Sequence, residues 1–335
     1  MSRILIIKPS ALGDVATTLP LLCDLKRAMP GAEIDWLIHP LYAPVIAGHD
    51  ALHEWIGFDR KGLGAWWYKP SATRRFTGLL KTLREKKYDI VIDAQGLLRS
   101  GFLAKVTRAK MRIGFADARE GGSLFYTHKV KIRRREAPAV VRMRALLEPL
   151  GIPHGGAAEY RVPLQGEAVA KVHELVPDGE AKGLIGFLPG CRGEGKRWAA
   201  EGFARVIAEV AEGHSVVLLG SPDERELCAE IARKSAGKGV INLAGRTSVA
   251  EMIAMLDRCR LVVGNDTGPL HVAVALGRRV LGLYGKTDPK SVGPYGQMEN
   301  VVRFRPGEAW EETSREVVAR VGKMMSAGGA GATTR

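Results

Sequence analysis

One stretch indicates the architecture of this 335-residue chain most directly: Leu261-Val262-Val263-Gly264-Asn265-Asp266-Thr267-Gly268-Pro269-Leu270-His271. Its apolar start has the composition of a strand buried on both faces. A loop of small and polar residues follows, and a helical pattern continues from it to Leu276. A strand, a short loop and a helix in this order form the repeating unit of an open parallel α/β sheet. The stretch therefore predicts one such unit.

The loop of this stretch is also a candidate binding site. The hydroxyl of Thr267, Gly268 and the free N–H groups at the start of the helix suit a phosphate or pyrophosphate. Asp266 fits better on a ribose or sugar hydroxyl, and His271 lies one helical turn after Thr267 on the same face. The same residues also fit a helix-capping motif with a packed histidine. Both interpretations remain open from these residues.

The alternation of strand and helix patterns extends over most of the chain and predicts an α/β fold with two mostly parallel sheets. In the second half, the predicted strands are Leu184–Leu188, Ser215–Leu219, Val240–Leu243, Leu261–Gly264 and Val280–Tyr284, and the predicted helices are Ala199–Glu212, Asp223–Lys234, Ser248–Arg258 and Gly268–Leu276. In the first half, the predicted strands are Arg3–Lys8, Glu33–His39, Asp89–Ala94, Met111–Phe115 and Lys129–Ile132, and the predicted helices are Leu12–Met29 and Ser71–Lys87.

The length favours two domains, each large enough to bury its own core. We expect an N-terminal domain over residues 1–160 and a C-terminal domain over residues 179–307. The stretch between them, 161–178, borders a region rich in Gly and Pro and is predicted as a linker. A last helix over 308–325 and a disordered Gly/Ala tail over 326–335 complete the chain.

Composition excludes several classes of protein. The chain is 46% hydrophobic and 26% charged, which is typical of a globular protein rather than a disordered or fibrous one. No apolar run approaches the ~20 residues that a membrane-spanning helix needs, and the first strand is too short for a signal peptide, so we expect the protein to stay inside the cell. The cysteines, Cys23, Cys191, Cys228 and Cys259, form no C-x-x-C pair, which favours reduced thiols over a zinc site or disulfides.

The charge is strongly basic and uneven. The net charge is +14, and residues 60–144 hold 22 basic and 6 acidic residues, a net charge of +16 within that window. Aromatic residues, including Trp66 and Trp67, are interleaved with these cations. The basic charge therefore predicts an anionic partner for one half of the molecule. From charge alone, this partner can be nucleic acid, an anionic membrane surface or a phosphorylated substrate.

Other polar loops also follow predicted strands, where open α/β sheets bind ligands. Ser10-Ala11-Leu12-Gly13-Asp14 follows the first strand, and Asp14 fits either a helix cap or a carboxylate base. It is not a Walker A loop, because the G-x-x-x-x-G-K-[ST] pattern is missing. The glycine-rich loop after Leu188 carries Arg192, Lys196 and Arg197, which suit a diphosphate or form a solvated turn.

A further loop, Gly220-Ser221-Pro222-Asp223-Glu224, also opens a helix. An acidic residue in this position can bind the ribose hydroxyls of a nucleotide. Asp223 and Glu224 also fit as ordinary acidic residues of a first helical turn.

Together these motifs resemble glycosyltransferase family 9, the ADP-heptose–lipopolysaccharide heptosyltransferases, over nearly the whole chain, and the middle motifs are most similar to heptosyltransferase I. The motifs that carry the resemblance are the Ile4–Lys8 strand with Ser10-x-x-Gly13-Asp14, then Asp93-Ala94-Gln95-Gly96-Leu97, Ala118-Arg119-Glu120 with Ser123-Leu124-Phe125-Tyr126, Lys196-x-Trp198, Asp266-Thr267-Gly268-x-x-His271, and Tyr284-Gly285-Lys286-Thr287-Asp288-Pro289.

The resemblance implies a GT-B fold, with two Rossmann-like domains facing across a cleft and a C-terminal helix that crosses back to the first domain. It implies an inverting transfer of heptose from ADP-L-glycero-D-manno-heptose to the Kdo of Kdo2–lipid A, with no metal and no cofactor, and with Asp14 as the general base. The implied donor-binding residues are Cys191, Arg192, Lys196, Glu224, Asp266, Thr267, Gly268 and His271. The implied acceptor-binding residues are Ser10, Gly13, Lys61, Gln95 and Arg119.

The chain departs from the family pattern at two places. Where many relatives have hydroxyl residues in the phosphate loop, it has Cys191 and Arg192, and Arg192 is expected to substitute for the missing hydroxyl. Lys286 stands where proline is frequent, and the sequence offers no functional interpretation of that change. The resemblance also implies a protein that binds the cytoplasmic face of the inner membrane peripherally.

Three alternatives accompany this interpretation. The first keeps the fold with another nucleotide sugar or a later inner-core acceptor, as in heptosyltransferase II. The second is a basic nucleic-acid-binding protein, against which stands the absence of a helix-turn-helix, RNP or zinc pattern. The third is a non-catalytic ADP-binding regulator, which the presence of Asp14 disfavours.

Overall fold

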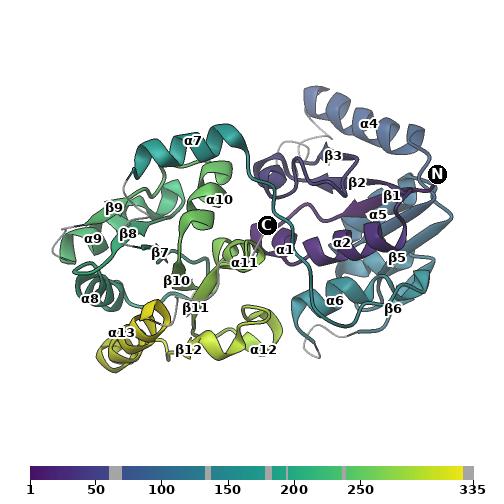
Figure 1. Ribbon diagram of the computed structural model, residues 1–335. Coiled ribbons are helices and arrows are strands. Elements are labelled where there is room, and N and C mark those ends of the chain that lie inside the picture. The colour runs from purple at the N-terminus through teal and green to yellow at the C-terminus, as the bar shows by residue number, and fades with distance from the viewer. Residues whose placement is uncertain (60–69, 133–136, 178–182, 194, 236–238, 327–335) are drawn as a thin grey trace. The chain divides into compact units, whose positions relative to one another are not determined.

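The computed structural model describes residues 1–59, 70–132, 137–177, 183–193, 195–235 and 239–326. The chain divides into two compact units, Met1–Pro163 and Leu164–Arg335, each with its own sheet. Figure 1 labels the elements of both units. Lys61, Trp66, Trp67 and the predicted tail over 327–335 lie outside the described residues.

The first unit is built on a parallel six-stranded sheet in the order β3-β2-β1-β4-β5-β6. Its strands are β1 (Arg3–Ile7), β2 (Glu33–Ile38), β3 (Glu54–Gly57), β4 (Ile90–Asp93), β5 (Met111–Phe115) and β6 (His128–Val130). The central strand β1 reads Ile-Leu-Ile-Ile after Arg3, and all four of these residues are fully buried, as a strand covered on both faces requires.

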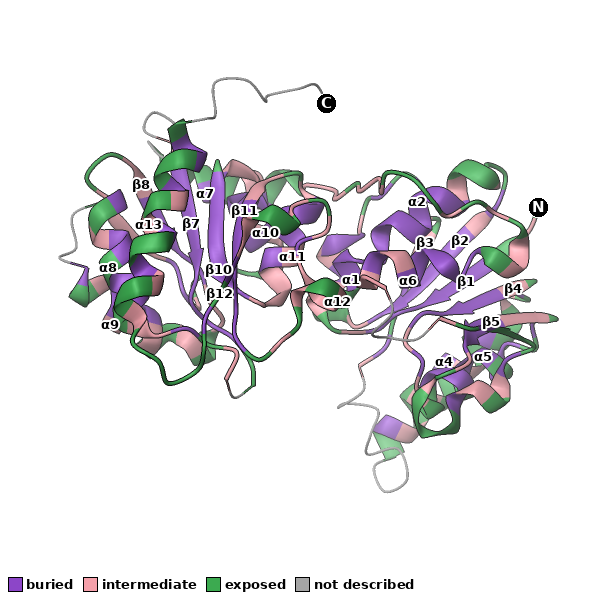
Figure 2. Ribbon diagram, turned by 90° about the horizontal axis from the view of Figure 1, so that it is seen from below, coloured by how far each residue is buried: buried purple, intermediate pink, exposed green. Residues whose placement is uncertain are grey.

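Helices cover both faces of this sheet (Figures 1 and 2). They are α1 (Leu12–Ala16), α2 (Leu19–Ala28), α4 (Pro70–Glu85), α5 (Leu98–Val106) and α6 (Ala139–Ala145), with 3-10 turns η1 (Pro40–Val45), η2 (Arg119–Phe125) and η3 (Glu148–Leu150). The single helix predicted over Leu12–Met29 is wrong. It breaks at Thr17 and Thr18, and Pro20, which has no N–H to donate, occupies the first turn of α2.

The second unit repeats the plan with a parallel six-stranded sheet in the order β12-β11-β10-β7-β8-β9. Its strands are β7 (Leu184–Leu188), β8 (Ser215–Leu218), β9 (Val240–Asn242), β10 (Leu261–Asn265), β11 (Arg279–Tyr284) and β12 (Val301–Arg303). The prediction of two parallel α/β sheets is therefore confirmed. The sequence analysis missed β3 and β12, which are the outermost strands and are short.

The helices of the second unit are α7 (Gly166–Leu175), α8 (Ala200–Val210), α9 (Arg225–Lys234), α10 (Val249–Arg258), α11 (Gly268–Ala275), α12 (Pro289–Val292) and α13 (Trp310–Ser326), with η4 (Pro222–Glu224) and η5 (Met298–Asn300). Figure 2 shows buried strands between helices that expose their outer faces. No helix in the described residues is both long and apolar enough to cross a membrane.

One boundary prediction needs correction. The segment predicted as a linker over 161–178 contains α7, which packs on α10, and Arg258 donates to the carbonyl oxygens of Val172 and Val176. Within the second unit, the last helix α13 packs on α8, and its buried Val317 and Val321 belong to the apolar core of that unit.

Candidate functional site

Each sheet has one point at which the chain reverses its direction of winding. In the first unit this point lies between β1 and β4, and in the second between β7 and β10. In open α/β sheets the loops at the carboxyl ends of these strands diverge and leave room for a ligand. Most of the predicted site residues lie on these loops or on the loops of the neighbouring strands.

Asp14 lies in the loop-to-helix turn after β1. Its Oδ2 accepts a hydrogen bond from the backbone N–H of Ala11 (3.0 Å), so the carboxylate does cap α1, as the simpler interpretation predicted. The same oxygen is 4.0 Å from the buried ammonium of Lys8, while the Asp14 side chain is 52% exposed. Among the described residues nothing binds Oδ1. The capping contact therefore fixes one oxygen and leaves the other able to accept a proton.

Lys8 was not singled out by the sequence analysis, although it supports this turn. Its side chain is 6% exposed, and its Nζ donates to the carbonyl oxygen of Ala94 (3.1 Å), which ties the loops after β1 and β4 together. A lysine directly after the apolar run Ile4-Leu5-Ile6-Ile7 was the available signal.

Gln95 and Arg119 lie on the next loops of the same edge. Buried Asp93 accepts hydrogen bonds from the backbone N–H groups of Gln95 and Gly96 and from the hydroxyl of Tyr126 (2.6 Å). Burial raises the pKa of Asp93 even though these donors favour its charged form. The backbone N–H of Arg119 donates to Gly96, which fixes η2 beside this loop.

The amide of Gln95 has an unpaired oxygen. Its Oε1 is buried without a hydrogen-bond partner among the described residues, whereas the Arg119 side chain is exposed. Ser10 and Gly13 are half-buried on the turn that carries Asp14. The structure thus brings together four of the five predicted acceptor residues at one sheet edge. Lys61 lies outside the described residues.

In the second unit, Asp266 is the centre of a charged cluster. Its side chain is 8% exposed, Lys196 Nζ lies 3.1 Å from its Oδ2, and His271 Nε2 lies 3.5 Å from its Oδ1. Burial alone would raise the pKa of Asp266, but His271 and Lys196 outweigh it and lower the pKa. The cluster lies at the start of α11, where Thr267 occupies the N-cap and its hydroxyl makes no capping bond.

Asn265 holds this arrangement in place and was missed as a functional residue. It is fully buried, its Oδ1 accepts from the backbone N–H of Trp198 (3.0 Å), and its Nδ2 donates to the carbonyl oxygen of Pro189 (2.8 Å). The amide thereby ties both ends of the glycine-rich loop to β10. A polar residue that ends an apolar strand was again the signal.

Cys191 and Arg192 begin that loop. The buried thiol of Cys191 contacts the carbonyl oxygen of Asp266 (3.1 Å), and burial, reinforced by the charge of Asp266, raises its pKa to about 11. The thiol is therefore neutral at pH 7 and acts as a packing group. Arg192 is exposed.

Glu224 lies close to the same loop. Its Oε2 accepts from the backbone N–H of Ser221 (2.7 Å), so it caps its own turn as the simpler interpretation predicted. Its carboxyl group also covers Gly190, where a Cβ would lie 2.0 Å from Glu224 Cδ. The missing Cβ of Gly190 leaves room for the carboxyl group in this position. The second carboxylate oxygen has no partner among the described residues.

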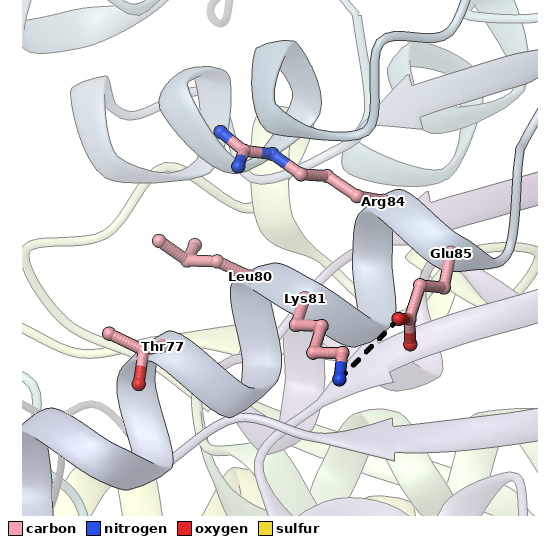
Figure 3. A pocket seen from close by; sticks show the side chains of 5 residues that line it. All are labelled: Thr77, Leu80, Lys81, Arg84 and Glu85. Atoms are coloured by element: carbon pink, nitrogen blue, oxygen red, sulfur yellow. Dashed lines mark ion pairs between the residues drawn. The ribbon is translucent and has the colours of Figure 1, made fainter.

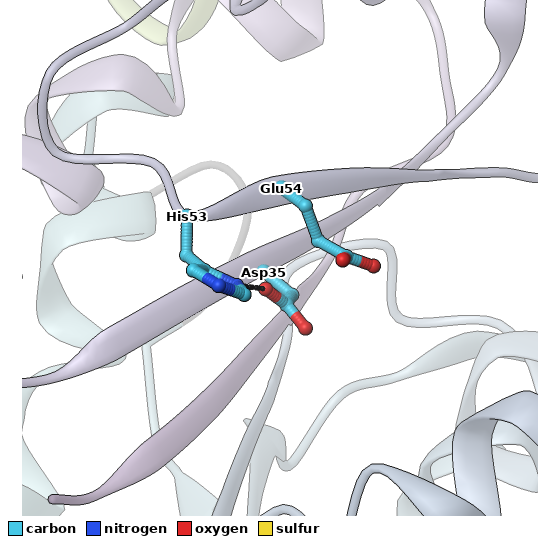
Figure 4. A group of neighbouring side chains, drawn as sticks. All are labelled: Asp35, His53 and Glu54. Carbon is cyan, nitrogen blue, oxygen red and sulfur yellow. Dashed lines mark hydrogen bonds and ion pairs between the residues drawn. The ribbon is translucent and has the colours of Figure 1, made fainter.

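Two other features lie away from these edges. Asp35, His53 and Glu54 form a cluster with metal-ligand chemistry (Figure 4). Lys86 already supplies a cation to this cluster, with Nζ 3.1 Å from Asp35 and 2.6 Å from Glu54.

A shallow hollow lies along α4, lined by Thr77, Leu80, Lys81, Arg84 and Glu85 (Figure 3). Because one helix supplies all five side chains, the hollow is part of an exposed helix surface.

Comparison with known proteins agrees with this geometry. The model of "Glycosyltransferase family 9 (heptosyltransferase)" matches residues 76–320. Lipopolysaccharide heptosyltransferase 1 of Escherichia coli O18:K1:H7 is 32% identical over 94% of this chain and 95% of its own, and lipooligosaccharide heptosyltransferase 2 of Haemophilus influenzae is 28% identical over 91% and 90%. The solved structure of E. coli heptosyltransferase WaaC with ADP-2-deoxy-2-fluoro heptose is 29% identical, covers 96% of this chain and 99% of its own, and has a TM-score of 0.76.

Two parallel Rossmann-like sheets, together with the structural match to a heptosyltransferase, place the chain among the GT-B glycosyltransferases. The sequence match over most of the chain identifies the family within this class. The chain belongs to glycosyltransferase family 9, the heptosyltransferases.

Proposed function

We propose that this protein transfers heptose from ADP-L-glycero-D-manno-heptose to the Kdo of Kdo2–lipid A, as a heptosyltransferase I. The observation that carries the proposal is the cluster of Lys196, Asp266 and His271 at the N-terminus of α11, because it combines a cation, a carboxylate and free N–H groups at a nucleotide-binding edge. Identity to a heptosyltransferase 1 (32%) exceeds that to a heptosyltransferase 2 (28%), which favours the first acceptor over the second.

In this mechanism Asp14 is the general base. It accepts the proton of the acceptor hydroxyl while that oxygen attacks the anomeric carbon of the heptose from the face opposite the diphosphate, so the configuration inverts. Oδ2 is held by the N–H of Ala11, so Oδ1 is the oxygen available for the proton. The exposure of the side chain gives the acceptor access to it.

The second unit stabilises the departing ADP. The Lys196 ammonium and the N–H groups at the start of α11, beside Thr267 and Gly268, neutralise the charge that develops on the diphosphate. Asp266 and His271 are proposed on the sugar side, and the free oxygen of Glu224 on the ribose hydroxyls. Because protein cations supply this charge, we propose a transfer without a metal or cofactor, for which full activity in excess EDTA is the test.

The first unit receives the acceptor. We propose that Arg119 and Lys61 bind its carboxylates and phosphates, and that the unpaired amide oxygen of Gln95 accepts from a sugar hydroxyl beside Ser10 and Gly13. The excess of basic residues over 60–144 suits a lipid-linked anion, so we also propose peripheral binding at the cytoplasmic face of the inner membrane.

The experiment is to supply ADP-heptose with either Kdo2–lipid A or the same lipid already carrying one heptose, and to weigh the products by mass spectrometry. The proposal expects a gain of one heptose on Kdo2–lipid A and little on the heptosylated lipid. The reverse preference would assign the chain to the second candidate, a heptosyltransferase II. If ADP-heptose gives no product with either lipid and another nucleotide sugar does, the proposed donor is wrong.

A further inference from the structure

A second lysine lies at the glycine-rich loop of the second unit, outside the cluster around Asp266. Lys286 follows β11, the neighbour of β10, at the carboxyl edge of the sheet. Its backbone N–H donates to the carbonyl oxygen of Gly195 (3.0 Å). The position was a departure from the family pattern to which the sequence assigned no role.

The side chain of Lys286 lies across Gly195. A Cβ on that glycine would be 2.6 Å from both Cδ and Cε of Lys286, and Gly195 has a φ of +74°. The left-handed backbone favours glycine, and the missing Cβ leaves room for the Lys286 side chain. The ammonium, one bond beyond Cε, is therefore carried at the same loop that holds Lys196.

The two lysines differ in how their charge is used. The ammonium of Lys196 is paired with the carboxylate of Asp266, so part of its charge is balanced within the protein before a ligand binds. The side chain of Lys286 is exposed and makes no hydrogen bond or ion pair with any residue that the structure describes. No described residue therefore pairs with its ammonium.

We propose that Lys286 binds the diphosphate of the donor nucleotide, as a cation additional to Lys196. The inference rests on the proposed function, because it takes ADP as the leaving group. A diphosphate carries more negative charge than the Lys196–Asp266 pair can balance. Arg192 is the neighbouring cation and is also exposed on this loop. Together, Lys286 and Arg192 take the place of the hydroxyl residues that are absent at positions 191 and 192.

The test is to measure the affinity of the full chain for ADP and for adenosine by calorimetry. Lys286→Met keeps an unbranched stem over Gly195 but removes the ammonium, and Lys286→Arg keeps the charge. Lys290→Met is the matched control, since Lys290 is also exposed. Its backbone N–H donates to Asp288 Oδ1, a bond that the substitution leaves in place. We expect Lys286→Met to weaken ADP binding about tenfold and to leave adenosine unchanged, as for the loss of one charge-assisted contact.

The remaining outcomes separate this inference from the function on which it rests. Lys286→Arg and Lys290→Met should retain most of the ADP affinity. If the wild-type chain binds ADP and Lys286→Met binds it equally well, Lys286 is not a diphosphate ligand, while the proposed donor stands. An equal loss for ADP and adenosine would mean that Lys286 only shapes the loop. If the wild-type chain binds no ADP, both the proposed donor and the assignment of Lys286 are wrong.

Discussion

Asp14 combines a local role with a chemical one. A carboxylate three residues after Ala11 caps the helix through one oxygen, and no described residue binds the other oxygen. From the sequence, the helix cap and the carboxylate base were alternatives for Asp14. In the structure the cap uses only one oxygen, so the two roles are compatible. The sequence marks the neighbouring cation Lys8 by its place after an apolar run, but it does not identify its partner, because the contact with Ala94 joins residues 86 positions apart.

Asp266 gives a prediction at the level of one residue. Its pKa in the folded protein lies below the ordinary value, so ionised Asp266 stabilises the fold above the unfolded pKa, and that stabilisation is lost as the pH falls through the folded pKa. Asp266→Asn should therefore lower the free energy of unfolding by about 1–3 kcal/mol at pH 7. The difference from wild type should shrink below about pH 4.

Urea unfolding of both proteins between about pH 2.5 and 7 measures this difference. An advantage of the wild type that stays constant or grows towards acid pH would contradict the ion pairs around Asp266. His271→Gln serves as a comparison, since it removes one partner and leaves the contact with Lys196.

At the scale of elements, the inner strands of each sheet and the edge strands β6 and β9 were predictable, whereas the edge strands β3 and β12 were not. β5 and β7 match their predicted bounds, and in β7 the uninterrupted apolar run is the direct consequence of burial on both faces. β3 exposes Trp55 and carries Glu54, and β12 has only three residues, so neither has an apolar pattern. Their pairing with β2 and β11 comes from the tertiary structure.

The position of α13 was not predictable for a related reason. Its amphipathic pattern shows that one face is buried, but not which helix covers that face. The structure pairs it with α8. In the second unit, Val317 is fully buried within the core cluster, while the next residue, Val318, is only partly buried.

This difference gives a prediction for the helix. Val317→Ala should lower the free energy of unfolding by about 2 kcal/mol, because it removes two buried methyl groups and leaves a cavity. Val318→Ala, with the same chemical change, should cost clearly less. Denaturant unfolding measures both values, and equal losses would show that the two faces of α13 are not distinguished by this packing.

At the scale of the whole molecule, charge is the dominant property. On α4 the exposed residues Arg74 and Arg84 lie in the window with the largest basic excess. We predict that the protein binds anionic vesicles at low salt and is released by high salt, since screening weakens exposed charges. Neutral vesicles should not bind it.

Charge reversal locates this binding. Arg74→Glu with Arg84→Glu should weaken vesicle binding at least tenfold, at about 1 kcal/mol for each basic residue near the surface. Lys171→Glu with Arg305→Glu makes the same change in net charge on exposed positions of the second unit and should have a smaller effect. Equal effects would mean that net charge, rather than α4, determines binding, and tight binding of duplex DNA in high salt would favour the nucleic-acid alternative.

The most direct test of the central claim, that Asp14 acts on the acceptor while ADP binds the other unit, is to compare wild type with Asp14→Asn. Asparagine keeps an oxygen that can cap Ala11 but cannot take a proton. We predict that heptose transfer from ADP-heptose to Kdo2–lipid A falls about 10²–10⁴-fold in kcat, while the affinity for ADP is unchanged. Retained transfer, or a large loss of ADP affinity, would contradict the assignment.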